Sequence, residues 1–492
     1  MSTHSNKFNI FALSQANIRT LHITWFAFFM TFVVWLGLGP IMPFIKEALA
    51  LTDQQAKVLL ILNVAMTIPS RIIVGMLVDK FGPRILFSAI LVLGGLISIA
   101  FSWASSYENL AILRFLSGFI GAGFVVGIRM IGEWFPARQT GLAQGIYGGW
   151  GNFGSAGAAV SLPFIAASIG GDDGWRYAIT FASVAAIAYG AFYYAVARNT
   201  PRGSTYFKPA KTGAMEITSG KDLLLYMLMN IPLFLALALL TWKLSPLNMD
   251  LIDSSTAIII YVVLTLVYFV QTWKIWQVNS HVLKEPVPAM QRFKFKQVAI
   301  LNWAYFVTFG TELAVVSVLA LFYVEWFDIP KVSAALLAGV YPFINLFARP
   351  GGGWISDIIG RKRTLAIAFA GVTGSFLLLG MVDKSWPLWM VVGMTIIGGI
   401  FSKGGSGAVY AMVPLIQRRM TGQIAGMTGA FGNVGAVLFL TVNSIISYDQ
   451  FFLFIGIVSA VVFGLILFFL EEPKGQMAET LPDGTVQMID VK

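Results

Sequence analysis

The sequence predicts an all-α integral membrane protein with two pseudo-symmetric six-helix bundles and an extra two-helix hairpin between them. Of the 492 residues, 57% are hydrophobic and 11% are charged, and the mean hydropathy is +0.77, which is not the composition of a soluble domain. Apolar runs long enough to cross about 30 Å of hydrocarbon recur along the whole chain, and only helices satisfy their own backbone groups in such runs. A short pattern that occurs twice indicates that the two halves derive from one unit.

The repeated pattern starts with an arginine inside an apolar segment. All of its positions are offset by 278 (349 − 71). The matched pairs are Arg71 and Arg349, Gly75 and Gly353, Asp79 and Asp357, and Gly82 and Gly360. A cation inside a bilayer span is costly, so a matched pair of arginines indicates a place where an anion is held.

Fourteen transmembrane helices are expected, with both termini in the cytoplasm. The expected spans are 22–45, 57–78, 84–106, 108–131, 141–170, 176–197, 223–243, 255–277, 298–324, 332–355, 364–382, 386–412, 421–446 and 450–470. In this topology the inside loops hold most of the Lys and Arg residues, whereas outside loops hold acids such as Asp172 and Asp253. That bias follows the excess of basic residues in cytoplasmic loops.

These spans divide the chain into five parts. They are a cytoplasmic N-terminal tail (1–21), an N-terminal six-helix bundle (22–198), a central linker with the two extra helices (199–297), a C-terminal six-helix bundle (298–470) and a cytoplasmic C-terminal tail (471–492). The extra pair at 223–277 has basic flanks and an acidic turn, so it is expected to enter the membrane and return. In the alternative, one of these helices lies along the interface, because Pro232 interrupts the first and Lys274 ends the second.

Composition and the absence of catalytic patterns argue against several other classes. The net charge of +10 is dispersed through short loops, so it indicates membrane orientation rather than nucleic-acid binding. Cysteine is absent, which leaves no disulfide or thiol chemistry. No paired catalytic carboxylates, zinc-ligand cluster or Ser/His arrangement occurs, so we expect no enzyme activity, no metal and no cofactor.

The loop that follows the first arginine resembles a family motif. Residues 75–84 are similar to the loop between helices 2 and 3 of the major facilitator superfamily, and residues 353–363 are similar to its counterpart in the second half. The resemblance implies the fold of that superfamily and a transporter. In the family this loop has a structural and conformational role, which the resemblance assigns to Gly75, Asp79, Arg84, Gly353, Asp357 and Arg361. Arg114 heads a segment that resembles the helix 4 motif of proton-coupled carriers, and Arg129 and Glu133 are spaced to form an ion pair.

A second repeated motif places an asparagine between glycines. The first copy holds Gly151, Asn152 and Gly154, and the second holds Gly432, Asn433 and Gly435, with an offset of 281 (433 − 152). Together the copies resemble the paired signature of the nitrate/nitrite porter family. The glycines let helices or a small ligand approach the backbone, although a packing face is the alternative. The amides are costly in lipid, yet each can donate to an oxyanion or bridge two helices.

Aromatic residues at helical spacing complete the expected binding site. Tyr305 and Phe309 are four residues apart and share a helix face. The resemblance implies that this pair lies against the anion and that Arg71 and Arg349 bind it. Nitrate is flat and singly charged, which suits aromatic walls and guanidinium forks. The alternative is that these aromatics are ordinary bundle core.

Glu312 is the candidate for proton coupling. A carboxyl group buried beside an anion site can take up a proton, and the sequence around it resembles the nitrate–proton symporters of the family. The alternative is a static pair of Glu312 with Lys403 or an arginine.

The sequence therefore predicts a secondary active transporter that imports nitrate across the cytoplasmic (inner) membrane by alternating access, with nitrite as a further substrate and the proton as coupling ion. Its partners are then the anion, the proton and the lipid bilayer. Three alternatives stay open: a nitrate/nitrite exchanger, a carrier of another small organic anion such as formate or oxalate, and a membrane-bound nitrate sensor.

Overall fold

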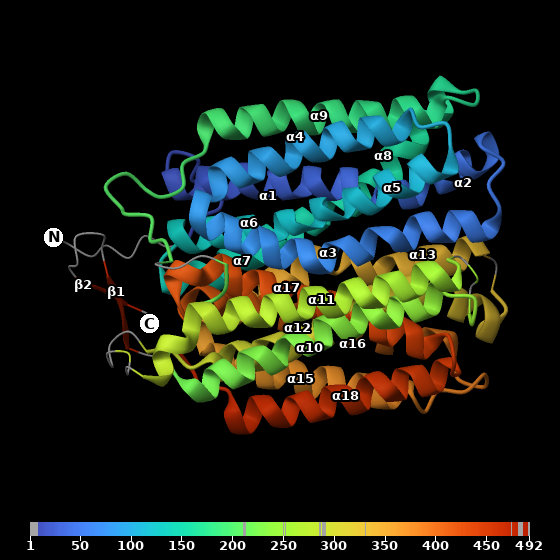
Figure 1. Ribbon diagram of the computed structural model, residues 1–492. Helices are drawn as coiled ribbons and strands as arrows, with labels where there is room; N and C mark the ends of the chain where they lie inside the picture. Colours follow the sequence, from blue (N-terminus) through green and yellow to red (C-terminus); the bar gives the residue numbers. More distant parts are fainter. Residues whose placement is uncertain are drawn as a thin grey trace.

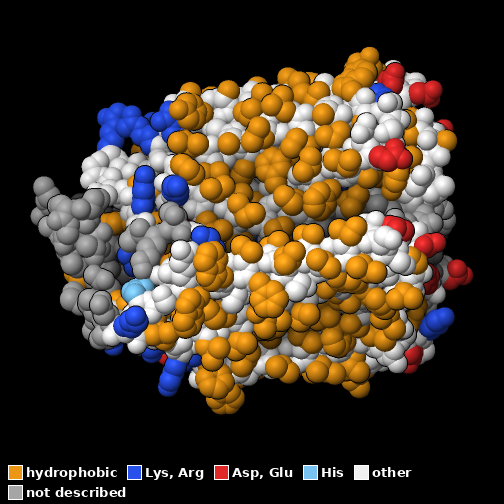
Figure 2. Space-filling model, in the orientation of Figure 1, with side chains coloured by type: hydrophobic (Ala, Val, Ile, Leu, Met, Phe, Trp, Pro, Cys, Tyr) orange, Lys and Arg blue, Asp and Glu red, His pale blue; other side chains and the backbone are white. Residues whose placement is uncertain are grey.

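The computed structural model describes residues 8–209, 213–248, 250, 252–284, 287, 292–329, 331–473, 475–480 and 486–490. Its helices run side by side along one direction, α1 to α9 in one bundle and α12 to α18 in the other (Figure 1). The α10–α11 hairpin lies beside the junction between the two bundles. Hydrophobic side chains cover the middle of the visible face, Lys and Arg gather at one end and Asp and Glu at the other (Figure 2).

In the first bundle, three of the expected spans are divided into consecutive helices. The elements are α1 Ala16–Leu36, α2 Leu38–Ala48, α3 Asp53–Phe81, α4 Pro83–Ser102, α5 Tyr107–Ser117, the 3-10 helix η1 Gly118–Ala122, α6 Gly123–Trp134, α7 Ala137–Asn152, α8 Gly154–Ile169 and α9 Gly174–Val196. The breaks in 22–45, 108–131 and 141–170 fall at or beside glycines. A side chain at Gly37 would collide with the Val33 carbonyl of α1 and with Leu162 of α8. The junction between α1 and α2 therefore packs closely on α8.

The central linker contains two long helices. They are α10 Gly220–Leu244 and α11 Ser254–Asn279, followed by the 3-10 helix η2 Ser280–Leu283. Ser219 and Asp253 cap their N-termini by accepting hydrogen bonds from backbone N–H groups of the first turns. Pro232 lies inside α10 without ending it. α10 packs on α11 and on α12 and α17 of the second bundle.

The second bundle repeats the order of the first. Its elements are α12 Phe295–Phe327, α13 Lys331–Phe343, α14 Asn345–Ile359, α15 Arg361–Leu379, α16 Leu388–Met412, the 3-10 helices η4 Val413–Leu415 and η5 Arg418–Met420, α17 Thr421–Asn443 and α18 Tyr448–Phe469. The tail adds an antiparallel pair of strands, β1 Gln476–Thr480 and β2 Val486–Asp490. The expected fold was all-α, and this hairpin departs from it. Five-residue strands are too short to produce the long apolar runs on which that expectation rests.

Twelve helical segments of the described chain are long and apolar enough to cross a membrane. The expected number was fourteen. The two expected spans outside the twelve are α3 and α13–α14, which carry Arg71 and Arg349. Near residue 344 the second of these is divided, so α13 has 13 residues and α14 has 15.

Candidate functional site

Arg71 and Arg349 meet between the two bundles. Arg71 lies on α3 and Arg349 on α14, and their exposed fractions are 1% and 2%. The Cζ atoms lie 5.7 and 5.6 Å from the ring centroid of Phe124 on α6, and 5.3 and 5.8 Å from that of Phe309 on α12. The two guanidinium groups therefore share the same two aromatic rings and are turned away from lipid.

Neither arginine forms an ion pair in the described part of the chain. Arg71 Nη1 donates to the carbonyl of Gly429 on α17 (2.6 Å), and its Nε donates to the carbonyl of Gly121 (3.5 Å). Arg349 Nη2 donates to the hydroxyl of Tyr305 (2.8 Å), while its Nη1 has no hydrogen-bond partner among the described residues. Two buried positive charges without a carboxylate make this region a favourable place for an anion.

Each arginine side chain lies against a glycine of the opposite bundle. A Cβ at Gly148 on α7 would lie 3.2 Å from Arg349 Cδ, and one at Gly429 on α17 would lie 3.1 Å from Arg71 Cδ. These two glycines are offset by 281 (429 − 148). They are not among the expected site residues, although glycines repeat between the two halves at this offset.

The two glycines that the sequence analysis did select support aromatic rings. A Cβ at Gly432 would lie 2.7 Å from Phe309 and 2.8 Å from Tyr305, so Gly432 lets that aromatic pair lie flat on α17. A side chain at Gly151 would collide with the ring of Phe28 on α1. Phe28 corresponds to Phe309 (309 − 28 = 281), so both glycines have the same packing role.

The two asparagines of the motif differ in their contacts. Asn433 is 1% exposed, and its Nδ2 donates to the Gly429 carbonyl (3.4 Å), which also accepts from Arg71. Asn152 is 7% exposed, and its Nδ2 has no partner among the described residues. Asn433 is therefore joined to the arginine site by a shared carbonyl, whereas Asn152 has an unused donor.

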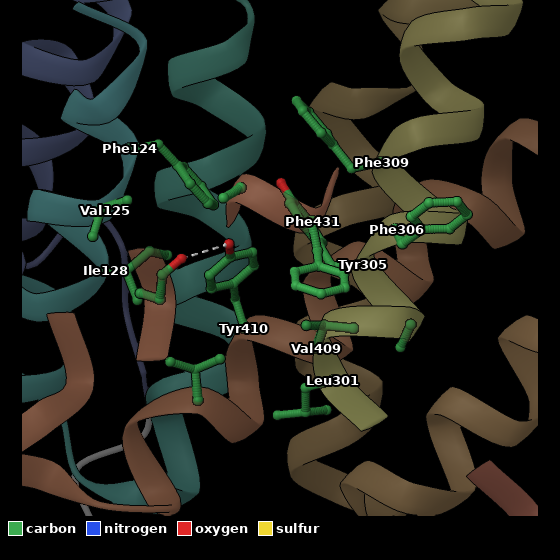
Figure 3. Close-up of a cluster of buried hydrophobic side chains, with 14 of the residues drawn as sticks. Phe124, Val125, Ile128, Leu301, Tyr305, Phe306, Phe309, Val409, Tyr410 and Phe431 are labelled. Atoms are coloured by element: carbon green, nitrogen blue, oxygen red, sulfur yellow. Dashed lines mark hydrogen bonds between the residues drawn. The ribbon is translucent and has the colours of Figure 1, made fainter. Parts of the chain in front are cut away.

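Aromatic rings form the wall around the arginines. Tyr305 stacks on Phe309 with a centroid separation of 5.0 Å and an interplanar angle of 5°. Tyr410 on α16 meets the rings of Phe124 and Tyr305 edge to face, at 4.6 and 4.8 Å. Figure 3 shows Phe124 and Tyr410 opposite Tyr305 and Phe309. Sequence reasoning missed Phe124 and Tyr410, which belong to no repeated motif.

Asp79 joins the two bundles at the end where Lys and Arg gather. Its carboxylate accepts hydrogen bonds from the backbone N–H groups of Gly422 (2.9 Å) and Gln423 (2.8 Å), in the first turn of α17. A side chain at Gly75 would collide with the Gly422 carbonyl. The carboxylate thus satisfies orphan donors at a helix N-terminus and lies at the positive end of its dipole.

Asp357 makes the matching contact in the opposite sense. It accepts from the N–H groups of Gly141 (3.0 Å) and Leu142 (2.8 Å), which are the fifth and sixth residues of α7. A side chain at Gly353 would collide with the Gly141 carbonyl. The N–H donors of the two sites are offset by 281 (422 − 141). Each bundle therefore supplies one aspartate and one pair of backbone donors to the contacts that join the bundles.

The basic partners of the two aspartates differ. Arg361 lies 3.1 Å from Asp357, and it also donates to the Ala137 carbonyl at the start of α7. Arg84 does not reach Asp79. Its guanidinium lies over the ring of Tyr194 (4.4 Å) and donates to the carbonyl of that residue, so it stays within its own bundle.

The basic partner of Asp79 is Arg129, at 3.4 Å. Arg129 also pairs with Glu133 (3.2 Å), as the sequence spacing predicted, and Glu133 pairs with Arg418 of the second bundle (3.2 Å). From the central linker, the Tyr206 hydroxyl lies 3.1 Å from Arg129 Nε. This buried network ties both bundles and the linker together.

Two other candidates form no hydrogen bond or ion pair with the arginine pair in the described part of the chain. Arg114 is buried inside the first bundle, where it donates to the carbonyls of Leu59 (3.1 Å) and Trp35 (3.0 Å). Glu312 accepts a hydrogen bond from Asn345, one helical turn before Arg349. The described residues contain no ion pair between Glu312 and Lys403 or an arginine.

Comparison with known proteins agrees with this architecture. The sequence model of the Major Facilitator Superfamily matches residues 24–277 and 301–489. A nitrate/nitrite transporter NrtP of Nostoc punctiforme is 43% identical over 467 residues, covering 94% of this chain and 93% of that protein. The NrtP of a Picosynechococcus species is 40% identical over 504 residues, covering 94% of both. A crystal structure of a double-tryptophan mutant of XylE superposes with a TM-score of 0.65 at 16% identity, covering 93% of this chain and 97% of that one.

Proposed function

Because the chain belongs to the major facilitator superfamily and is a relative of its nitrate/nitrite transporters, we propose that it imports nitrate, and nitrite as a further substrate, by alternating access. One observation carries the proposal. Two buried guanidinium groups, one from each bundle, share the rings of Phe124 and Phe309 and have no carboxylate partner among the described residues.

The proposed site suits a small planar anion. Arg71 and Arg349 supply the charge, Tyr305 and Phe309 supply flat walls, and Asn152 has a free amide donor. Asn433 donates to the Gly429 carbonyl, which also accepts from Arg71. Because Gly151 and Gly432 have no side chain, the aromatic rings can pack directly on their helices. We add four residues to the proposed site because they contact the arginines or their aromatic wall: Phe124, Tyr410, Gly148 and Gly429. A monovalent oxyanion placed between the guanidinium groups would accept from the unpaired Nη1 of Arg349.

Occupancy of this site would control closure of the two bundles. At a separation of about 6 Å and an effective dielectric constant of about 20, two like charges repel by about 3 kcal/mol. An anion between them reverses that repulsion. The contacts of Asp79 with α17 and of Asp357 with α7 would then open and close as the bundles rock, which is the conformational role we propose for Gly75, Asp79, Gly353, Asp357 and Arg361.

Uptake by the purified protein in liposomes tests the function. We expect nitrate to accumulate, and we expect the substitutions Arg71→Lys and Arg349→Lys to abolish accumulation. Formate and oxalate should compete poorly with nitrate. Tighter binding of either organic anion would replace nitrate as the substrate and leave the rest of the mechanism intact.

Proton coupling is part of the proposal, with Glu312 near the site as its first candidate. Glu312 contacts Asn345, which precedes Arg349 by one turn, so a change of charge at Glu312 would be felt at the anion. An imposed inward pH gradient should drive uptake, and Glu312→Gln should reduce the gradient-driven part. Uptake that ignored the gradient and required internal nitrite would favour the exchanger.

We also propose fourteen transmembrane helices in the cytoplasmic membrane, with both termini in the cytoplasm. α3 has 29 residues and the α13–α14 pair runs from Lys331 to Ile359, so each is long enough to cross. The basic end seen in Figure 2 is the expected cytoplasmic side. Because the chain has no cysteine, single cysteines can be introduced and labelled from one side. Labelling of Asp253→Cys from outside and of Ser204→Cys only after permeabilisation is the expected result.

A further inference from the structure

A second group of buried polar side chains lies in the C-terminal bundle beside Arg349. Lys403 on α16 is fully buried, and its Nζ lies 3.5 Å from the ring centroid of Tyr341 on α13. The Nζ has no hydrogen-bond partner among the described residues. Buried polar groups are normally hydrogen-bonded, so an unpaired primary amine at this depth is an exception that needs a physical explanation.

The only carboxylate of this group is not bonded to the amine. Glu312 on α12 is 5% exposed, and its Oε1 accepts from Asn345 while its Oε2 has no partner among the described residues. The described chain contains no contact of 4 Å or less between Nζ of Lys403 and Glu312. Lys403 Nζ and Glu312 Oε2 thus lie in one buried region, and neither atom has a hydrogen-bond partner among the described residues.

These ionisable groups occur in only one half of the pseudo-symmetric structure. The offset of 281 that pairs Thr140 with Thr421 and Gly141 with Gly422 aligns the helix before α7 in the first half with α16. Lys403 then corresponds to Ala122 (403 − 281).

The other two positions give the same result. Glu312 corresponds to Thr31 (312 − 281) and Asn345 to Thr67 (345 − 278). The hydroxyl groups of both threonines donate hydrogen bonds to backbone carbonyls, at 2.6 and 2.9 Å. At these three matched positions the ionisable pair therefore occurs in the C-terminal bundle alone, where the N-terminal bundle has an alanine and a threonine.

The charges around Lys403 make its protonation depend on the anion. Glu312 on α12 and Arg349 on α14 are the charged groups that act on it, and Tyr341 on α13 covers it. On α7 and α15, which also pack on α16, the described titratable side chains are Tyr147 and the basic residues 361–363 at the start of α15.

A buried ammonium without an acceptor is strongly disfavoured, and Arg349 repels it further. Arginine keeps its proton in proteins, whereas a buried lysine gives its proton up readily. A negative charge between Arg71 and Arg349 would offset their field and favour the ammonium form. Anion binding and protonation would then each promote the other by the same factor.

We propose that Lys403 carries the coupled proton: its amine releases a proton more readily in the empty closed carrier and is held as an ammonium when nitrate binds between the two arginines. The inference rests on the proposed function. One proton adds to the amine from the side on which nitrate enters, and the same proton leaves on the side where nitrate leaves. Glu312 Oε2 is the group that accepts a hydrogen bond from the new ammonium, so Lys403 acts on nitrate through charge and without contact.

Calorimetry of nitrate binding to the purified full chain tests this directly. The binding enthalpy is measured in two buffers of different ionisation enthalpy, and the difference gives the number of protons taken up. We expect about one proton per nitrate for the natural chain at alkaline pH, where the amine of the empty protein has lost its proton. We expect about zero for Lys403→Arg, which keeps the positive charge but cannot release a proton, and about zero for Lys403→Gln. Lys274→Arg on the exposed α11 is the matched control and should stay near one.

The pH dependence gives a second measurement. Because binding takes up a proton, the nitrate Kd of the natural chain should rise about tenfold per pH unit once the amine is deprotonated in the empty protein. The Kd of Lys403→Arg should stay flat over the same range. A merely structural lysine would leave both the proton count and the slope unchanged when arginine replaces it.

The outcomes separate the two proposals. Failure of the natural chain to bind nitrate would refute the proposed function. Nitrate binding with no proton uptake, or uptake of one proton that persists in Lys403→Arg, would overturn the assignment of Lys403 and leave nitrate transport standing. If uptake is lost in Glu312→Gln but kept in both Lys403 variants, the proton belongs to the carboxyl group instead.

Discussion

The carboxylate of Asp79, in the N-terminal bundle, accepts a 2.9 Å hydrogen bond from the backbone N–H of Gly422, in the C-terminal bundle. The two residues are 343 positions apart in the chain. Asp357 accepts the equivalent hydrogen bond from the backbone N–H of Gly141, so an aspartate from each bundle accepts from the backbone of a helix in the other. If the bundles separate at this end in the proposed transport cycle, both contacts must break, and we call this pair of contacts the gate.

Substitution of either aspartate of the gate should favour the open state at this end. Asp79→Asn removes the charge that α17 holds at its N-terminus, and we expect the loss of about 1.4 kcal/mol, or tenfold in the open-to-closed ratio. In the cysteine-free chain, Ile128→Cys lies behind the gate and is fully buried. Its maleimide labelling should accelerate by that factor in Asp79→Asn and in Asp357→Asn. Asp383→Asn, at the opposite end, is the control, and equal acceleration there would contradict the gate.

Arginine-to-lysine changes should weaken nitrate binding although the charge is kept. A lysine cannot place two N–H donors on one planar anion, and it cannot stack between Phe124 and Phe309 as a guanidinium does. We expect the nitrate Kd to rise by about 10- to 100-fold in Arg71→Lys and in Arg349→Lys, as measured by calorimetry. Arg202→Lys in the exposed linker should bind like the natural chain. An unchanged affinity in both site variants would remove the arginines from the binding site.

The glycines that face the arginines should tolerate no side chain without a change in affinity. In Gly148→Ala and Gly429→Ala the new methyl group would lie 3.2 and 3.1 Å from an arginine Cδ, so the guanidinium has to shift by a few tenths of an ångström. We expect the Kd for nitrate to rise by about three- to tenfold while the protein stays folded. Gly374→Ala, where no atom lies within 4 Å, is the matched control. Wild-type affinity in both site variants would show that the guanidinium positions are not critical.

Two further glycines should matter for stability rather than for binding. Gly82 and Gly360 end α3 and α14 with φ angles of +88° and +99°, which residues with a side chain rarely adopt. Alanine at either position should cost about 1–3 kcal/mol. Thermal unfolding in detergent should therefore show a lower Tm for Gly82→Ala and Gly360→Ala than for Gly464→Ala, an α18 position with open space around it. Equal Tm values would mean that the backbone relaxes at no cost.

Several features of the site follow from the sequence because they are local or repeated. A helix long and apolar enough to cross a membrane shows in its hydropathy, and Arg71 and Arg349 stand out because a charge interrupts an apolar run. The spacing of Tyr305 and Phe309 places them on one face, and the structure stacks them at 5.0 Å. Arg84 shows the limit of this reasoning. The resemblance assigns it the same role as Arg361, but Tyr194 packs against its guanidinium, and the Asp79 carboxylate pairs with Arg129 instead.

The sequence by itself determined that this chain is a helical membrane protein built from two copies of one unit, with a cation in each copy, since hydropathy and repeat spacing need no knowledge of packing. Only the tertiary structure decided that Phe124 and Tyr410 line the arginine pair, that Gly148 and Gly429 face its side chains, and that Lys403 lies unpaired over Tyr341. These contacts join helices distant in the chain, and which faces meet depends on how the two bundles pack. No local pattern records that choice.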